Sequence, residues 1–258
     1  PPPPKTLFPY TTLFRSLTFP LALLETPKSR RQSVQSIIAL FKQCFPVFIA
    51  LFMYALIDNM PKFVMETALS YDNQLYFNAL YFPAQAILLT VGFVYKPLLV
   101  RMAQMWADAE KRNRFHLVIL AIVAMVIALT LVVIFLMGWI GIPIMSFMYG
   151  VDFEQFRGLS FIMIAAGGVT AIIDFLYQVI TVLRRQKSVM KLYVITFGFS
   201  LFVPILLIDF TGLPGAVIGY LIVMTILMVL LVWEYISICL DLSRHPVSQN
   251  PVPVSVDE

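Results

Sequence analysis

The segment from residue 158 to residue 185 constrains the fold most, because it is an apolar helix that carries a polar stripe. It exceeds the length of about 20 residues that crosses a bilayer. At about 100° per residue, its polar and small side chains fall in one narrow sector: Gly167, Thr170, Asp174, Gln178, Thr181 and Arg185. An aspartate at such depth costs roughly 2.5–3.5 kcal/mol on insertion scales, so this face must look into protein or a wet cavity. The sequence therefore predicts a bundle with a polar interior inside a membrane.

The composition also indicates a chain embedded in a membrane. Hydrophobic residues make up 60% of the chain and charged residues 12%, whereas soluble domains are nearer half apolar and a quarter charged. The two cysteines, Cys44 and Cys239, lie far apart and form no Cys/His set, which argues against a disulfide framework or a metal site. We expect no cofactor, no metal and no nucleic-acid partner.

The apolar segments predict an all-α membrane protein, a six-transmembrane-helix bundle. The predicted spans are residues 43–59, 76–100, 116–140, 158–185, 190–209 and 213–239. Lys and Arg gather before the first span, after the second, and between the fourth and fifth. By the positive-inside rule, both termini are then cytoplasmic.

The chain divides into four predicted parts. Residues 1–16 look like a translated sequencing adapter, so we expect a non-native leader and an N-terminally truncated product. Residues 17–42 form a cytoplasmic amphipathic lead-in, and residues 43–240 form the transmembrane lobe. The tail at 241–258 is rich in Pro and Ser and is expected to be disordered.

A second polar stripe runs along the second span. Its members lie on one face about 40° wide: Asn78, Gln85, Gly92 and Lys96. Two such stripes indicate a shared cavity, but their small and amide side chains could also serve only to let neighbouring helices pack. Lys96 could form a structural ion pair with Asp174 or extend toward the cytosolic surface. Arg101 could anchor the topology or bind a phosphate.

Several segments resemble the C-terminal lobe of polysaccharide or O-antigen flippases, which belong to the multidrug/oligosaccharidyl-lipid/polysaccharide exporter superfamily. The first hairpin carries the resemblance at Asn59, Met60, Pro61, Lys62, Asp72, Tyr76 and Ala79. Further segments are similar in order and spacing: VYKPLLVRMAQMWADAEKRNRF (94–115), IMSFMYGVDFEQF (144–156), VLRRQKSVMKLYV (182–194) and TGLPGAVIGYLI (211–222). The resemblance covers residues 28–240 and implies one lobe of a two-lobe flippase, whose N-terminal lobe is missing here.

That resemblance also implies a substrate and a set of site residues. The substrate would be a polyprenyl-pyrophosphate-linked oligosaccharide, moved across the bacterial plasma membrane for O-antigen, lipopolysaccharide or other surface polysaccharide biosynthesis. Lys96 and Arg101 would face the pyrophosphate, and Asp174 with Gln178 would line the cavity or couple transport to a proton or cation. The remaining substrate-binding residues would be Gln85 and Asn78 on the second stripe, and Asp58 and Asn59 near the outer exit.

Two other functions compete with this one. A cation-coupled multidrug exporter of the same superfamily would use Asp174 as its coupling acid, and an acidic cavity would favour it, whereas a basic cavity favours an anionic lipid. A membrane glycosyl polymerase is an enzyme that usually needs a large outer loop with catalytic Arg or His. The longest predicted outer loop, residues 141–157, holds only Arg157, so we do not expect an enzyme. A truncated lobe could also be a non-transporting scaffold.

Overall fold

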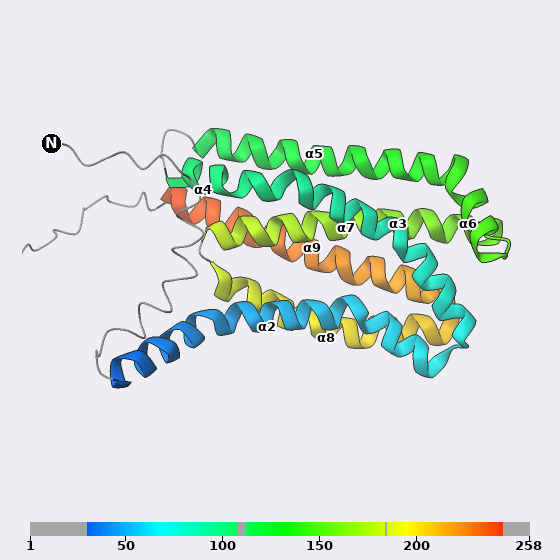
Figure 1. The fold of residues 1–258 in the computed structure, drawn as a ribbon, viewed down its shortest axis with the longest axis horizontal. Helices are drawn as coiled ribbons and strands as arrows, with labels where there is room; N and C mark the ends of the chain where they lie inside the picture. The colour runs from blue at the N-terminus through cyan, green and yellow to red at the C-terminus, as the bar shows by residue number, and fades with distance from the viewer. Residues whose placement is uncertain (1–29, 108–111, 184, 245–258) are drawn as a thin grey trace, which may run out of the picture. The chain divides into compact units, whose positions relative to one another are not determined.

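The computed structural model describes residues 30–107, 112–183 and 185–244, and every element in these ranges is helical (Figure 1). The elements are α2 (Arg30–Ala68), α3 (Tyr71–Tyr95), η1 (Lys96–Leu98), α4 (Leu99–Ala107), α5 (Arg112–Leu136), η3 (Met137–Gly141), α6 (Ile142–Tyr149), η4 (Glu154–Phe156), α7 (Arg157–Val182), α8 (Gln186–Thr211) and α9 (Leu213–Arg244). The predicted leader at 1–16 lies outside the described residues, as do residues 17–29 of the lead-in and 245–258 of the tail.

Six helical segments in the described part are long and apolar enough to cross a membrane. They are Cys44–Ala68, Tyr71–Trp106, Arg112–Tyr149, Glu154–Val182, Gln186–Thr211 and Leu213–Leu240. These segments confirm the prediction of an all-α six-helix bundle and of a multi-pass membrane protein. The chain divides into two units at residue 45, and all packing described below lies within residues 46–258.

The helix α7 is the centre of the bundle. It packs against α3, α4, α5, α8 and α9, and it is the most buried of the six spans. In Figure 1 it runs between α5 on one side and α9 on the other. Gly167 and Thr170 of the predicted stripe are buried. The N-terminal part of the stripe therefore faces protein, as the sequence predicted.

A close crossing of two helices fixes α7 against α3. A Cβ atom built on Gly167 would lie 2.6 Å from the Cβ atom of Ala84 and 2.7 Å from its Cα atom. Glycine is therefore the residue that permits this approach, as small residues do at interfaces between membrane helices. The helices meet directly at this level and leave no space between them for a cavity.

Two segments predicted to lie between spans, residues 60–75 and 141–157, are mostly helical. The first span does not end before Pro61: α2 continues to Ala68, and Pro61 and Met65 are both buried. Packing of this last part outweighs the backbone hydrogen bond that a proline removes, which membrane helices tolerate. The predicted tail also begins as helix, since α9 continues to Arg244.

The predicted loop at 141–157 is also mostly helical. A π-helical turn, η3, leads into α6 without a break in the helix, and Pro143 stands in the first turn of α6. The helix ends at Gly150, whose φ of 67° is the left-handed conformation that glycine adopts easily. The turn before α7 is correspondingly short.

The crossing of α3 and α7 can be tested by adding one methyl group. We expect Gly167→Ala to destabilise the bundle by about 1–3 kcal/mol, because the methyl group must displace the Ala84 backbone. Gly198→Ala is the matched control, since nothing lies within 4 Å of a Cβ atom there. Unfolding of both variants by pulse proteolysis in detergent would measure the difference, and equal stability would contradict the close crossing.

Candidate functional site

The face of α3 that meets α7 carries tyrosine hydroxyls, not the predicted amide and lysine stripe. Phe77, Tyr81, Ala84, Val91 and Tyr95 are buried and recur at helical spacing. Each residue of the predicted stripe lies about 100° further round the helix, because it is the next residue along the chain. Asn78 and Lys96 are accordingly exposed and Gln85 is half-buried. The two predicted stripes do not face each other.

Asp58 on α2 accepts hydrogen bonds from two tyrosines on two other helices. The hydroxyl of Tyr81 on α3 lies 2.9 Å from each carboxylate oxygen of Asp58. The hydroxyl of Tyr220 on α9 donates to the Oδ1 atom at 2.7 Å. Hydrogen bonds to a charged group are worth about 1.5–3 kcal/mol each. This carboxylate therefore ties α2 to both α3 and α9.

The protons around Asp58 are fully used. The hydroxyl of Thr170 on α7 donates to the Ala166 carbonyl at 2.8 Å. The Tyr220 hydroxyl contacts the Thr170 hydroxyl at 3.4 Å, but each has a single proton. When Tyr220 donates to Asp58 and Thr170 to Ala166, no proton is left for the contact between them. A further bond between α7 and α9 at this point needs one of these hydroxyls to turn away from its present acceptor.

Lys62 and Asn59 lie within about one helical turn of Asp58. The ammonium group of Lys62 nevertheless forms no ion pair with the Asp58 carboxylate. The Nζ atom of Lys62 stands over the ring of Tyr81, 4.4 Å from the ring centroid. It also lies 3.4 Å from the Oδ1 atom of Asn59, whose amide nitrogen donates to the Ala55 carbonyl at 2.9 Å. Lys62 is thus held by a π face and an amide, beside the Asp58 cluster.

Asp174 on α7 has a similar partner on α3. The hydroxyl of Tyr95 donates to its Oδ2 atom. Tyr95 is fully buried, and its ring packs edge-to-face on Phe175 with 5.4 Å between centroids. Burial of a large aromatic ring fixes the hydroxyl in place, so the donor is set by packing as well as by the hydrogen bond.

A row of three tyrosine rings extends from the level of Asp174 toward Asp58. Tyr177 of α7 stacks on Tyr193 of α8 at 6.1 Å, and Tyr193 contacts Tyr54 of α2 at 5.8 Å. Tyr54 lies about one helical turn before Asp58 on α2, and Tyr177 about one turn after Asp174 on α7. We call these three rings and the Asp58 and Asp174 clusters together the carboxylate–tyrosine network.

The structural ion pair that remained open for Lys96 and Asp174 is not formed. The Lys96 side chain lies over its own helix at Gly92, where its Nζ atom would be 3.5 Å from a Cβ atom. Within the described residues, no cation is in ion-pair distance of either carboxylate. Hydroxyl donors replace the lysine because Tyr95, not Lys96, is on the face of α3 that meets α7.

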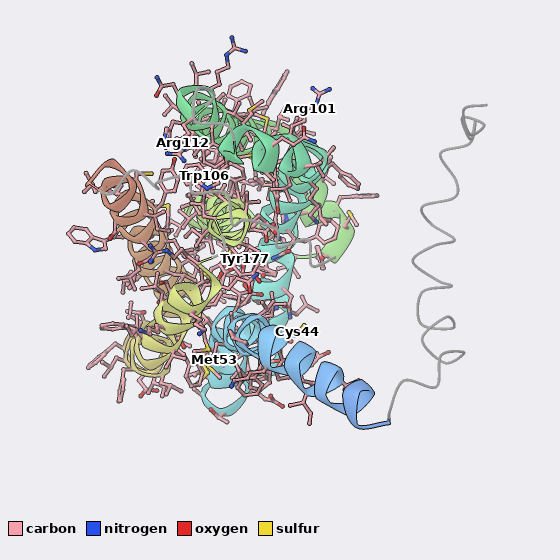
Figure 2. All side chains as sticks on the ribbon, turned by 90° about the vertical axis from the view of Figure 1, so that its left-hand side faces the viewer. Cys44, Met53, Arg101, Trp106, Arg112 and Tyr177 are labelled. Atoms are coloured by element: carbon pink, nitrogen blue, oxygen red, sulfur yellow. The ribbon has the colours of Figure 1, made fainter. Side chains whose placement is uncertain are left out.

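The other predicted site residues divide between the interior and the surface. Asp58, Asn59, Gln85, Asp174 and Gln178 are half-buried. Asn78, Lys96 and Arg101 are exposed, and Figure 2 shows the Arg101 side chain pointing away from the helices, whereas Tyr177 lies among them. The structure thus brings Asp58 and Asp174 into one network and leaves Asn78, Lys96 and Arg101 outside it.

The tyrosines are the residues that sequence reasoning missed. Tyr81 and Tyr95 are two heptads apart on one face of a span, and neither belongs to a predicted polar stripe. A tyrosine inside a membrane span carries a hydroxyl that needs a partner, so this spacing together with two intramembrane aspartates was a usable signal. Within the described residues, no cluster of His, Cys, Asp and Glu could hold a metal ion.

No family model, no curated protein and no solved structure matches this chain. The fold itself defines the class: an all-α protein whose described part contains six helices able to span a membrane. The resemblance to flippases is carried by the sequence segments alone.

Removal of one hydroxyl tests the Asp174 cluster. We expect Tyr95→Phe to destabilise the bundle by about 1.5–3 kcal/mol, because it removes the donor from a carboxylate inside the membrane. In the Asp174→Asn background the same substitution should cost clearly less, since the charged acceptor is gone. Tyr71→Phe, at an exposed residue, is the control. Additive effects of the two substitutions in unfolding measurements would exclude the hydrogen bond.

Proposed function

We propose that this chain is one lobe of a membrane transporter, a flippase that moves a polyprenyl-pyrophosphate-linked oligosaccharide across the plasma membrane for polysaccharide biosynthesis. The observation that carries the proposal is the carboxylate–tyrosine network inside a six-span bundle. Ionisable side chains within a membrane are costly, and their usual role is functional. A second six-helix lobe would complete the translocation path.

The network suits a protein whose helices must move. Asp58 joins α2 to α3 and α9, and Asp174 joins α7 to α3, in each case through tyrosine hydroxyls. Packing holds the rings and their oxygens in place, but each hydroxyl proton can rotate about its C–O bond toward another acceptor. Protonation of a carboxylate, or binding of a cation, would change which hydroxyls it holds. Asp174 is therefore the residue that we assign to coupling.

The exposed polar side chains on α3 support the proposal that a second lobe packs against this one. Asn78 and Lys96 are exposed and Gln85 is half-buried, on the face next to the one that meets α7. A polar face in this position is costly against lipid, but it would line a wet path if a second lobe stood opposite. Amide groups there could contact the sugars of the substrate.

Two cations are available for the pyrophosphate. Lys96 and Arg101 are exposed at the end where α3 gives way to η1 and α4. Neither side chain forms an ion pair or hydrogen bond within the described residues. The same end carries Arg112, Arg114, Lys187 and Lys191, at the starts of α5 and α8. By the positive-inside rule this end is cytoplasmic, which is where a pyrophosphate-linked substrate would enter.

A second candidate function has its own support. The interior of the described bundle has two carboxylates surrounded by aromatic rings, with no cation paired to either of them. Carboxylates and ring faces together attract organic cations. A cation-coupled multidrug exporter would place its substrate at this network, and would not need Lys96 or Arg101.

Binding of a labelled substrate separates the two functions. We expect the chain in nanodiscs to bind a fluorescent polyprenyl pyrophosphate more tightly than the corresponding polyprenol. Lys96→Ala and Arg101→Ala should each weaken this binding by about tenfold or more, as the loss of a charged hydrogen bond does. Lys191→Ala, at another exposed lysine of the same end, should leave the affinity unchanged.

Two results would contradict the flippase proposal. Equal affinity for the pyrophosphate and the alcohol would remove the proposed role of the cations. Binding of a lipophilic cation such as tetraphenylphosphonium, lost in Asp174→Asn and retained in Lys96→Ala, would favour the exporter.

A further inference from the structure

A groove lies on the side of α7 that faces α5, away from the carboxylate–tyrosine network. It has a volume of about 460 Å³ and is lined by Ile134, Phe135, Gly138, Trp139, Arg157 and Phe161. Five of these residues are apolar and one is a cation. Phe135 and Trp139 are largely exposed, so in a membrane the groove opens toward lipid.

A π-helical turn shapes this groove. The residues Met137–Gly141 form η3, where α5 would otherwise continue regularly into α6. Turns of this kind widen a helix and are frequent at functional sites. A Cβ atom on Gly138 would lie 3.2 Å from the Phe161 ring and 3.8 Å from the Nη2 atom of Arg157. The glycine thus keeps the space between α5 and α7 open.

Arg157 is held at one end of the groove with part of its hydrogen-bonding capacity free. Its Nη2 atom donates to the Gly138 carbonyl at 3.1 Å, and its Nη1 atom donates to Glu154 at 2.7 Å. A guanidinium has five N–H donors, and about half of this side chain is exposed. The ion pair with Glu154 is itself exposed, and such pairs contribute little.

The chemistry of the groove follows its depth in the membrane. Trp139 lies about 27 residues after Arg112, which is roughly 40 Å along a helix, and Trp is typical of the membrane boundary. Arg157, at the N-terminus of the 26-residue α7, lies at the same level. Ile134 and Phe161 lie about one turn deeper toward the middle of their spans. The polar end is therefore shallow and the apolar end deep, as in a phospholipid.

We propose that this groove binds one anionic phospholipid, with its phosphate on Arg157 and an acyl chain along Phe135 and Phe161. The positive end of the α7 dipole adds to the attraction of the guanidinium for an anion. The surrounding bilayer supplies this occupant to a groove that opens on the lipid-facing side. The site is independent of the proposed transport function, because none of its residues belongs to the carboxylate–tyrosine network.

Quenching of Trp139 by brominated lipids tests the site. The chain with Trp106→Phe and Trp233→Phe keeps Trp139 as its one fluorophore of this type. It is reconstituted in phosphatidylcholine bilayers that contain small, equal fractions of brominated phosphatidylglycerol or brominated phosphatidylcholine. We expect an association constant about fivefold higher for the anionic lipid. Arg157→Gln should abolish this preference.

Matched variants separate charge from shape. Arg114→Gln removes an exposed cation at the opposite end of α5 and should keep the preference. Glu154→Gln should increase it, because Arg157 loses its competing carboxylate. Gly138→Leu fills the groove and should weaken the preference while Arg157 remains. The decisive protein is the chain that carries only Trp106→Phe and Trp233→Phe. If both lipids quench its Trp139 equally, or if neither lipid quenches it, the proposal is wrong.

Discussion

A carboxylate inside a membrane needs hydrogen-bond donors, and this need determines how the helices of the bundle are joined. Asp58 and Asp174 meet this need with the hydroxyls of Tyr81, Tyr220 and Tyr95, and no described cation pairs with either. A buried ion pair would join two charges that are each costly to desolvate. A tyrosine donor adds a large apolar ring and a single proton, so the same residue fills the bundle interior and holds the charge.

The sequence predicted the parts of the fold that depend on hydrophobic length and period. Six apolar segments become six candidate spans, and the striped segment becomes the central helix α7. The same rules failed at residues 60–68 and 142–149, which lie between predicted spans but are helical. Burial of Pro61 outweighs the tendency of proline to end a helix, and at Pro143 the chain passes from the π-helical turn η3 into α6 without a break.

Helical period places residues on a common face of a helix, but it does not say which neighbouring helix that face meets. Asn78, Gln85 and Lys96 do share a face of α3, but Tyr81 and Tyr95 on the adjoining face meet α7. Close packing decides between the two faces. Ala84 on the tyrosine face lets Gly167 approach, whereas a lysine or glutamine at that crossing would hold the helices apart.

The two faces of α3 therefore have different physical demands. The inner face is satisfied within the lobe, since its hydroxyls bond to carboxylates of α2 and α7. On the outer face, the side chains of Asn78 and Lys96 form no hydrogen bond within the described residues, and lipid offers them no partner of equal strength. A movement of α3 that follows protonation of either carboxylate would also move this outer face. Asn78 lies on α3 itself, and Lys96 directly follows its last residue. A shift of Tyr95 on release from Asp174 would move Lys96, the next residue, with it.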